Sequence, residues 1–305
     1  MNPSDLGYSG DLFVLAFDHR GSFKQKMFGI SGRDATPEEE ERLRQAKRLV
    51  WEGFLAARDL GLPDGAGILV DEEMGAAVAR EARDLGVPFA MPVEKSGQPI
   101  FDFEYGEEFG AHIEEFDPTF SKVLVRWNPD DPAAEKQDQA ERLARLGTWL
   151  HDNGRTFLFE LLVPASERQL ALVGGDAAAY DSRVRPVLML ETIAELQAAG
   201  VEPDIWKIEG IDAREDCELI ARLTRSGGRD SVAAVVLGRG ADDAKVDHWL
   251  RQGAPVEGYA GFAIGRSIWW DGVAGWKNGT VSREAAAGMI ADSFRRFIDV
   301  YTSAA

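Results

Sequence analysis

Short apolar runs recur along the chain, and each is bounded by turn residues or by charged residues. Several runs are almost continuously apolar, as is typical of strands that are buried on both faces of a parallel sheet. The pattern predicts eight strands, which span residues 12–18, 65–71, 88–94, 121–128, 156–163, 203–210, 232–239 and 258–265.

The segments between these runs carry apolar residues at helical spacing. The first opens with Thr36-Pro37-Glu38-Glu39, a capping box with proline at the first helical position. Several of the later segments end in glycine, which suits a left-handed C-cap. After the first helix, the pattern predicts helices over residues 72–86, 133–154, 184–200, 214–228, 242–253 and 282–301.

Strand and helix alternate eight times, without a low-complexity linker or a long charge run. This count favours a closed (β/α)₈ barrel, the TIM barrel, over an open doubly wound sheet. The glycine fingerprint of a dinucleotide site is also missing, since Gly238-Arg239-Gly240 lacks the later glycine at the required spacing. We expect residues 1–305 to form one α/β barrel domain.

Composition limits the cellular compartment and the classes of binding partner that we expect. The chain has 52 acidic residues against 34 lysines and arginines, a formal net charge of −18, which argues against nucleic acid or a membrane surface as partner. Cys217 is the only cysteine, so no internal disulfide is possible. Neither a signal peptide nor an apolar stretch of about 20 residues is visible. We expect a soluble cytoplasmic enzyme, whose lysines and arginines must converge locally if its substrate is anionic.

Polar residues collect where the predicted strands end, which is where (β/α)₈ barrels place their active sites. One interpretation is that these residues only open loops and face water. A charge inside an apolar strand, however, is costly to bury without a partner or a function. The residues at these ends are Asp18, His19, Arg20, Asp71, Glu94, Lys95, Arg126, Glu160, Lys207, Glu209, Arg239, Gly265, Arg266 and Ser267.

Lys207 gives the sharpest signal, because it lies inside the apolar strand 203–210. Alternation places Lys207 and Glu209 on one face, and a lysine desolvated in the barrel lumen is suited to attack a carbonyl. Glu160, on the preceding strand, suits proton transfer during imine formation. The alternative for both is a structural ion pair in the core. Lys122 is either a second cation that keeps Lys207 neutral or a lysine in solvent at a strand start.

Two glycine-containing triplets follow the last two predicted strands. Gly238-Arg239-Gly240 follows the seventh strand, and Gly265-Arg266-Ser267 follows the eighth. Loops at these places commonly bind phosphate in this fold through backbone N–H groups, and arginine adds a permanently charged donor fork. Glycines in loops more often serve turns, but the joint placement favours a substrate that carries a phosphate.

Metal chemistry has little support in the sequence. His112, His151 and His248 fall in helical patterns, and no zinc-binding histidine spacing occurs. We therefore expect neither a metal nor another cofactor. The strand-end carboxylates nevertheless leave Mg²⁺ open as an alternative.

Six ordered motifs and the segment 102–106 (DFEYG) resemble the class I ketose-phosphate aldolase barrels. This group includes tagatose-bisphosphate and sulfofructose-phosphate aldolases. The closest resemblance is to the aldolase domain fused to the sugar kinase of bacterial inositol catabolism, over roughly residues 12–300. The motifs are LAFDHRGSF (15–23), ILVDEEMG (68–75), SKVLVRWNPDDP (121–132), FLFELLVP (157–164), PDIWKIEG (203–210) and GFAIGRSIWWD (261–271).

The resemblance implies a role for each matching residue. Lys207 is similar to the Schiff-base lysine, Glu160 to the acid/base glutamate, and Lys122 to the accessory lysine. The roles it implies are catalysis by Lys207, Glu160, Lys122 and Asp18, and binding of substrate or phosphate by Arg20, Asp71, Arg126, Arg239, Gly265, Arg266 and Ser267. Two departures bear on specificity. His19 replaces an amide of the bisphosphate aldolases, and Arg239-Gly240 replaces Leu-Asp of the inositol-pathway domains.

The implied reaction is cleavage of a phosphorylated keto sugar acid through an imine. The substrate implied is 2-deoxy-5-keto-gluconate 6-phosphate, which gives dihydroxyacetone phosphate and malonate semialdehyde. The first alternative is a tagatose-bisphosphate or sulfofructose-phosphate aldolase. Further alternatives are a Mg²⁺-dependent lyase that stabilises an enolate, and a barrel that binds sugar phosphates without catalysis. The sequence leaves open whether the chain forms a homo-oligomer.

Overall fold

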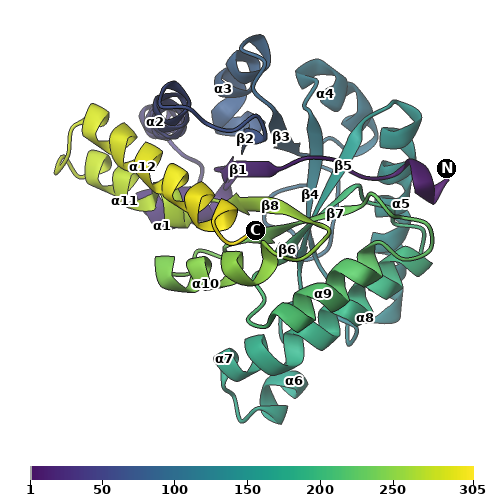
Figure 1. Cartoon of the computed structure of the whole chain (residues 1–305). Helices are drawn as coiled ribbons and strands as arrows, with labels where there is room; N and C mark the ends of the chain where they lie inside the picture. Colours follow the sequence, from purple (N-terminus) through teal and green to yellow (C-terminus); the bar gives the residue numbers. More distant parts are fainter. Residues whose placement is uncertain (1) are drawn as a thin grey trace.

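Eight parallel strands close into a barrel in the computed structural model, which describes residues 2–305 (Figure 1). Strand order follows chain order, and β8 pairs with β1 to close the ring. The predicted (β/α)₈ fold is therefore confirmed. The strands are β1 Leu12–Ala16, β2 Ala66–Leu69, β3 Phe89–Pro92, β4 Phe120–Arg126, β5 Thr156–Leu162, β6 Ile205–Glu209, β7 Ala233–Leu237 and β8 Tyr259–Ile264.

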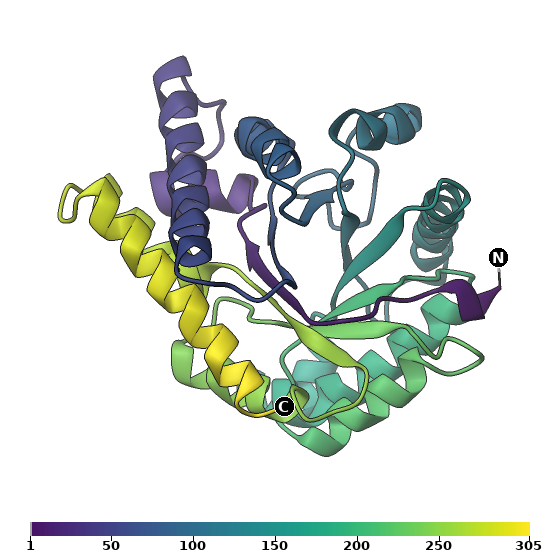
Figure 2. The same cartoon turned by 45° about the horizontal axis from the view of Figure 1, so that its top comes forward.

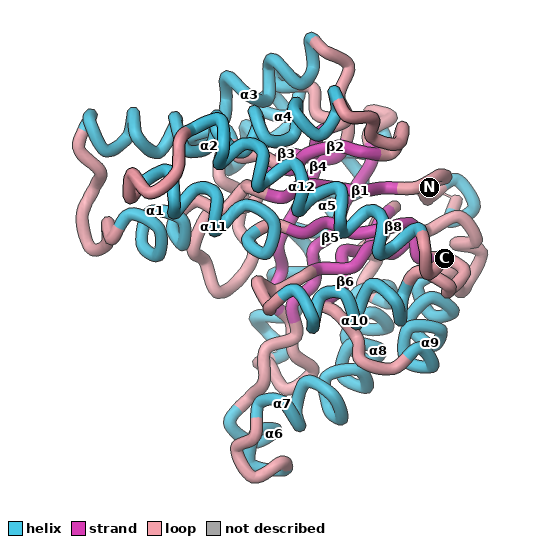
Figure 3. Tube along the Cα trace, turned by 60° about the vertical axis from the view of Figure 1, so that its left-hand side comes forward, coloured by secondary structure: helices cyan, strands magenta, loops and turns pink. Residues whose placement is uncertain are grey.

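Helices surround the strands, as Figures 2 and 3 show from two directions. α6 and α7 project away from the barrel, at the lower edge of Figure 1. A π-helical turn, Tyr180–Val184, connects α7 to α8, and short 3₁₀ turns span Pro3–Asp5 and Gly106–Glu108. The helices are α1 Gly21–Phe28, α2 Pro37–Asp59, α3 Glu72–Asp84, α4 Phe109–Phe116, α5 Ala133–Asp152, α6 Glu167–Leu172, α7 Ala177–Ala179, α8 Arg185–Ala198, α9 Arg214–Thr224, α10 Asp243–Gly253, α11 Arg266–Lys277 and α12 Arg283–Thr302.

All the predicted helices are present, but the sequence pattern missed several others. The most important are α1, α4 and α11, which follow β1, β3 and β8. α1 is only eight residues long and buries Phe23 and Met27, too few positions to show a helical period. This short helix forms part of the cavity wall described below.

The barrel interior changes character along its axis. Its lower part is a packed apolar layer that includes Leu12, Phe120, Leu158 and Ile205. Alternation brings Lys122, Glu160 and Lys207 to the same lumen two residues further along their strands. The charged residues therefore lie between this apolar layer and the carboxyl ends of the strands.

Barrel closure depends on a glycine where β8 meets β1. Gly261 pairs with Leu12 and has φ +145, a conformation that L side chains rarely adopt. A Cβ at this position would lie 2.1 Å from the carbonyl oxygen of Leu12. The backbone can approach this closely only because no side chain is present.

The chain's last helix returns to its beginning. α12, yellow in Figure 1, packs against α2 and α11 on the outside of the barrel. Over residues 2–305, no helix combines the length and the apolar character that a membrane crossing requires.

Candidate active site

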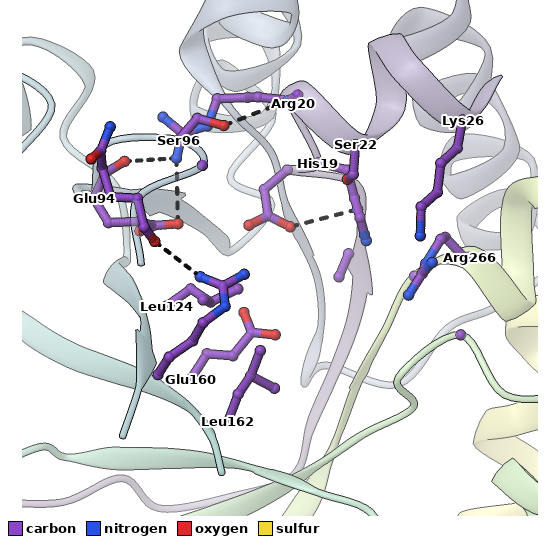
Figure 4. Close-up of a pocket in the computed structure, with 18 of the residues that line it drawn as sticks. His19, Arg20, Ser22, Lys26, Glu94, Ser96, Leu124, Glu160, Leu162 and Arg266 are labelled. Carbon is purple, nitrogen blue, oxygen red and sulfur yellow. Dashed lines mark hydrogen bonds and ion pairs between the residues drawn. The ribbon is translucent and has the colours of Figure 1, made fainter. Parts of the chain in front are cut away.

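A cavity of about 880 Å³ opens at the carboxyl ends of the strands (Figure 4). Its wall takes residues from across the barrel: Asp18 follows β1, Lys122 lies in β4, Glu160 in β5, Lys207 in β6, and Arg266 begins α11 after β8. Of the eleven residues assigned to the site from sequence, nine line this cavity. The other two, Asp71 and Ser267, do not.

Lys207 and Glu160 form the floor of the cavity. They are register partners on β6 and β5, so their side chains leave the sheet side by side. The Nζ atom of Lys207 lies 3.0 Å from Oε2 of Glu160, and both side chains are buried. The amine therefore has a proton acceptor in direct contact. This contact is also the ion pair that the structural alternative anticipates.

Lys122 lies on the other side of the same glutamate oxygen. Its Nζ atom is 3.1 Å from Oε2 of Glu160, 2.7 Å from Oδ2 of Asp18 and 2.9 Å from Oε1 of Glu94. Burial alone would lower the pKa of Lys122, but these three carboxylates outweigh burial and raise it. With 1% of its surface exposed, Lys122 is a fixed cation in the lumen, and the solvent-exposed alternative is excluded.

The three carboxylates around Lys122 differ in their electrostatic setting. Burial raises the pKa of Glu94 despite the nearby Lys122 and Arg20. Burial acts the same way on Asp18 and Glu160, but there Lys122 and Lys207 prevail and lower the pKa of both carboxyls. Asp18 and Glu160 are therefore ionised near neutral pH.

His19 is neutral at the edge of this cluster. Burial lowers its pKa to about 4, only partly opposed by Asp18. Its ring packs edge-on against Trp269 of α11, with centroids 5.6 Å apart. Nδ1 lies 4.0 Å from Asp18 and has no hydrogen-bond partner within the part of the chain described. His19 can therefore donate or accept one hydrogen bond without carrying a charge.

The loop after β8 places Arg266 at the cavity edge. Its Nη2 donates to the carbonyl of Arg239 at 2.8 Å. The guanidinium lies flat over Gly240, where a Cβ would come within 2.7 Å of it. Burial lowers the pKa of Arg266, and across residues 2–305 no carboxylate pairs with it. Gly265, the N-cap of α11, also lines the cavity. The Ser267 hydroxyl instead donates to the Ala241 carbonyl at 2.8 Å, outside the cavity lining.

The backbone carbonyl of Arg239 contacts Arg266, whereas its side chain pairs with two carboxylates. Its Nε lies 3.0 Å from Glu209, and its Nη1 donates to Asp181 at 2.8 Å. Glu209 also accepts from the Val163 N–H at 2.8 Å. The Arg239 side chain is thus neutralised, while its carbonyl positions Arg266.

Arg126 lies on the opposite side of the cavity, at the end of β4. Its side chain is exposed and donates to the Gln98 carbonyl at 3.2 Å. Like Arg266, it has no carboxylate partner among residues 2–305. Lys95, in the loop after β3, lines the same side of the cavity.

Arg20 and Asp71 have structural partners that sequence could not reveal. Arg20 is buried, and its Nη2 donates to the backbone carbonyl of Glu94 at 2.7 Å. Its Nη1 lies 3.4 Å from Oε2 of Glu104. Asp71 is fully buried, 2.6 Å from Lys47, and caps α3 through the Met74 N–H. The interpretation of Asp71 as a substrate ligand is corrected here, because its carboxylate does not reach the cavity.

Glu94 and Lys26 are among the cavity residues that received no role from sequence. Glu94 was noted at a strand end, but its contact with Lys122 needs the closed barrel. Lys26 lies on the unpredicted α1, so no strand-end rule could find it. The described residues contain no cluster of three or more histidine, cysteine, aspartate or glutamate side chains with metal-binding geometry.

The whole barrel corresponds to one protein family. A family model described as "Uncharacterized protein conserved in bacteria (DUF2090)" matches residues 7–305. The chain belongs to the DUF2090 family. No curated protein resembles the sequence closely enough to count as a relative.

Solved structures resemble this DUF2090 protein in fold. A structure from Corynebacterium glutamicum matches with a TM-score of 0.57 at 16% identity, over 95% of this chain and 88% of its own. A Schiff-base-forming fructose-1,6-bisphosphate aldolase gives 0.56 at 14% identity, over 94% of both chains. An archaeal fructose 1,6-bisphosphate aldolase gives 0.58 at 15% identity, over 96% and 94%. The DUF2090 chain thus shares its fold with two fructose-1,6-bisphosphate aldolases.

Proposed function

We propose that the protein is a class I aldolase in which Lys207 forms an imine with the ketone of a phosphorylated substrate. The observation that carries this proposal is the contact of 3.0 Å between Lys207 and Glu160 on the floor of the cavity. The shared fold with a Schiff-base-forming aldolase supports it.

The two buried lysines divide the work of imine formation. Both contact Oε2 of Glu160, but Lys122 also has Asp18 and Glu94, whereas Lys207 has Glu160 alone. Lys122 therefore keeps its proton, and a proton that leaves the pair passes from Lys207 to Glu160. The neutral amine then attacks the ketone, and Glu160 returns the proton to the departing hydroxyl as water is lost.

Cleavage uses the iminium as an electron sink. A carboxylate removes the proton from the hydroxyl on the carbon β to the iminium, that carbon becomes an aldehyde, and the carbon–carbon bond electrons form an enamine on Lys207. Glu160 and Asp18 are the ionised carboxylates nearest this point. Protonation of the enamine carbon and hydrolysis by water then release the ketone fragment and restore the amine.

Two arginines without carboxylate partners indicate where the two charged ends of the substrate bind. In chain order around the barrel, β6 with Lys207 lies between β4 and β8. Arg126 and Arg266 therefore flank the amine, one on each side, and neither has a carboxylate partner within residues 2–305. We assign the phosphate to Arg266 and the backbone around Gly265, and a second anionic group to Arg126.

A phosphorylated keto sugar acid has this charge distribution. In 2-deoxy-5-keto-gluconate 6-phosphate, the ketone stands one carbon from the phosphate, and the carboxylate lies at the far end. We propose this compound as the substrate, with dihydroxyacetone phosphate and malonate semialdehyde as products. A ketose bisphosphate or a sulfosugar phosphate, the substrates of the related aldolases, would place a phosphate or a sulfonate at Arg126 instead.

Turnover of the purified protein tests this function. The wild type should cleave 2-deoxy-5-keto-gluconate 6-phosphate faster than tagatose 1,6-bisphosphate, and Lys207→Met should reduce cleavage at least about 10³-fold. Saturating EDTA should leave the wild-type rate unchanged. A Lys207→Met variant that retains more than a few per cent of the rate would exclude the imine, and loss of activity with EDTA would favour the Mg²⁺-dependent alternative.

A further inference from the structure

Lys26 points into the cavity from a helix to which no role has been assigned. It lies in the last turn of α1, and its side chain and that of Arg266 point toward one another in Figure 4. The two residues come from opposite ends of the chain. They meet because β1 and β8, which precede α1 and α11, are neighbours in the closed barrel.

Two cations that face each other at a cavity create a positive potential that attracts an anion, and the exposed Lys26 ammonium is accessible to one. Lys26 forms no ion pair or side-chain hydrogen bond with any described residue, and Arg266 donates only to the Arg239 carbonyl. Two neighbouring cations are neutralised, since Lys24 of the same helix pairs with Glu73 and Arg239 pairs with Glu209. In a chain with net charge −18, this unbalanced pair marks a place for a bound anion.

Packing fixes α1 against α11. Phe23 of α1 is buried and packs edge-on against Trp269 of α11, with ring centroids 5.5 Å apart. Phe23 also contacts Phe28, and Gly29 ends the helix in the left-handed conformation. The helix that carries Lys26 is thus docked on the helix that begins with Arg266.

We propose that Lys26 is a phosphate ligand that holds the substrate's phosphate jointly with Arg266. The ammonium supplies a point charge from α1, and the guanidinium supplies a planar donor fork from the opposite side. The identity of the anion as a substrate phosphate rests on the proposed function. Binding of phosphate itself does not require catalysis.

Binding of inorganic phosphate to the whole protein tests the site directly, by ³¹P NMR titration at fixed ionic strength. Lys26→Gln and Arg266→Gln should each weaken phosphate binding about tenfold. The double variant should lose less than the product of the two losses, because both side chains act on one ion. Lys24→Gln is the matched control, since it removes a lysine from the same helix whose charge Glu73 already neutralises. It should change the affinity less than twofold.

The outcomes separate this inference from the aldolase proposal. Wild-type affinity in Lys26→Gln, equal losses in Lys26→Gln and Lys24→Gln, or no phosphate binding by the wild type would each overturn the role of Lys26. If phosphate binding depends on Lys26 but no imine forms with any ketose phosphate, the anion site stands and the aldolase function fails. Partial recovery of affinity in Lys26→Arg would support a direct ionic contact.

Discussion

Single residues at the cavity floor differ in how many opposite charges they meet. Lys122 has three carboxylates and Lys207 has one, which is why we assign the nucleophile to Lys207. Strand alternation predicted that Lys207 and Glu209 share a face, and the position of Glu160 on the preceding strand made it a candidate partner for Lys207. Alternation could not predict that Lys122 reaches across the barrel to Asp18 and Glu94, because that contact depends on ring closure. Nor could it separate Arg126, which is open to ligand, from Arg20, which is paired.

Arg126 provides the residue-scale test of the substrate's second charge. Arg126→Gln should raise KM for a phosphorylated keto acid about 10- to 100-fold with a smaller change in kcat, since one charge-assisted contact is lost. The same variant should treat a phosphorylated ketose that lacks the carboxylate nearly as the wild type does. Steady-state kinetics on both substrates measures this difference. Equal increases in KM for the two substrates would show that Arg126 does not bind the carboxylate.

Glu72 provides a pH-dependent test. Burial raises its pKa from 4.5 to about 7, and Arg20, 3.9 Å away, does not offset this. The folded protein therefore favours the protonated form, so this carboxyl lowers stability as pH rises from about 4.5 to 7. Glu72→Gln removes that cost. The free energy of unfolding of the variant, relative to wild type, should rise by on the order of 2 kcal/mol from pH 5 to pH 8. A pH-independent difference in urea unfolding would refute this.

At the scale of elements, the strands were predicted more accurately than the helices. Each predicted strand overlaps an observed one, because buried parallel strands leave continuous apolar runs. α1 and α4 were missed because each is only eight residues long, about two turns, which gives a weak helical period. α11 was missed because it begins directly after β8, at the triplet interpreted as a loop. The short length of α1 also hid Lys26. Asp71 was misread because its strand end is also the N-cap of α3, and the sequence does not show its partner Lys47 on α2.

Asp71 tests whether a strand-end carboxylate serves structure or substrate. Asp71→Asn keeps an N-cap acceptor but leaves Lys47 buried without its counter-charge, so it should lower the free energy of unfolding by about 3 kcal/mol or more. At a temperature where the variant is folded, kcat/KM should stay within about threefold of wild type. Asp84→Asn, on the exposed end of the same helix, is the control. Unchanged stability with a large rise in KM would restore the substrate-binding interpretation.

On the scale of the whole molecule, eightfold alternation implied a closed ring, but the means of closure was not readable from the sequence. Gly261 was one of 32 glycines, and only the paired backbone shows its close approach to Leu12. The charges that line the cavity were likewise not readable from the overall composition. A net charge of −18 gives no sign that the cavity contains cations without carboxylate partners, such as Lys26, Arg126 and Arg266, until the barrel brings them together.

Barrel closure predicts a strong effect at Gly261. Gly261→Ala places a Cβ 2.1 Å from the Leu12 carbonyl oxygen at φ +145, so it should lower the free energy of unfolding by about 3 kcal/mol or more. Gly288→Ala on α12, where the added Cβ meets no atom within 4 Å beyond the local helix backbone, should be neutral or slightly stabilising. Thermal unfolding of both variants checks the contrast. Similar melting temperatures for the two would show that β8 can shift away from β1.

The imine at Lys207 is the claim on which the proposed mechanism depends, and chemical trapping measures it directly. The protein is treated with sodium borohydride in the presence and absence of dihydroxyacetone phosphate, then digested and mapped by mass spectrometry. The account predicts inactivation only with the ketone present, and a reduced adduct on the peptide that contains Lys207, with none in Lys207→Met. Retained activity after borohydride with saturating ketone, or an adduct confined to Lys122 or another lysine, would contradict it.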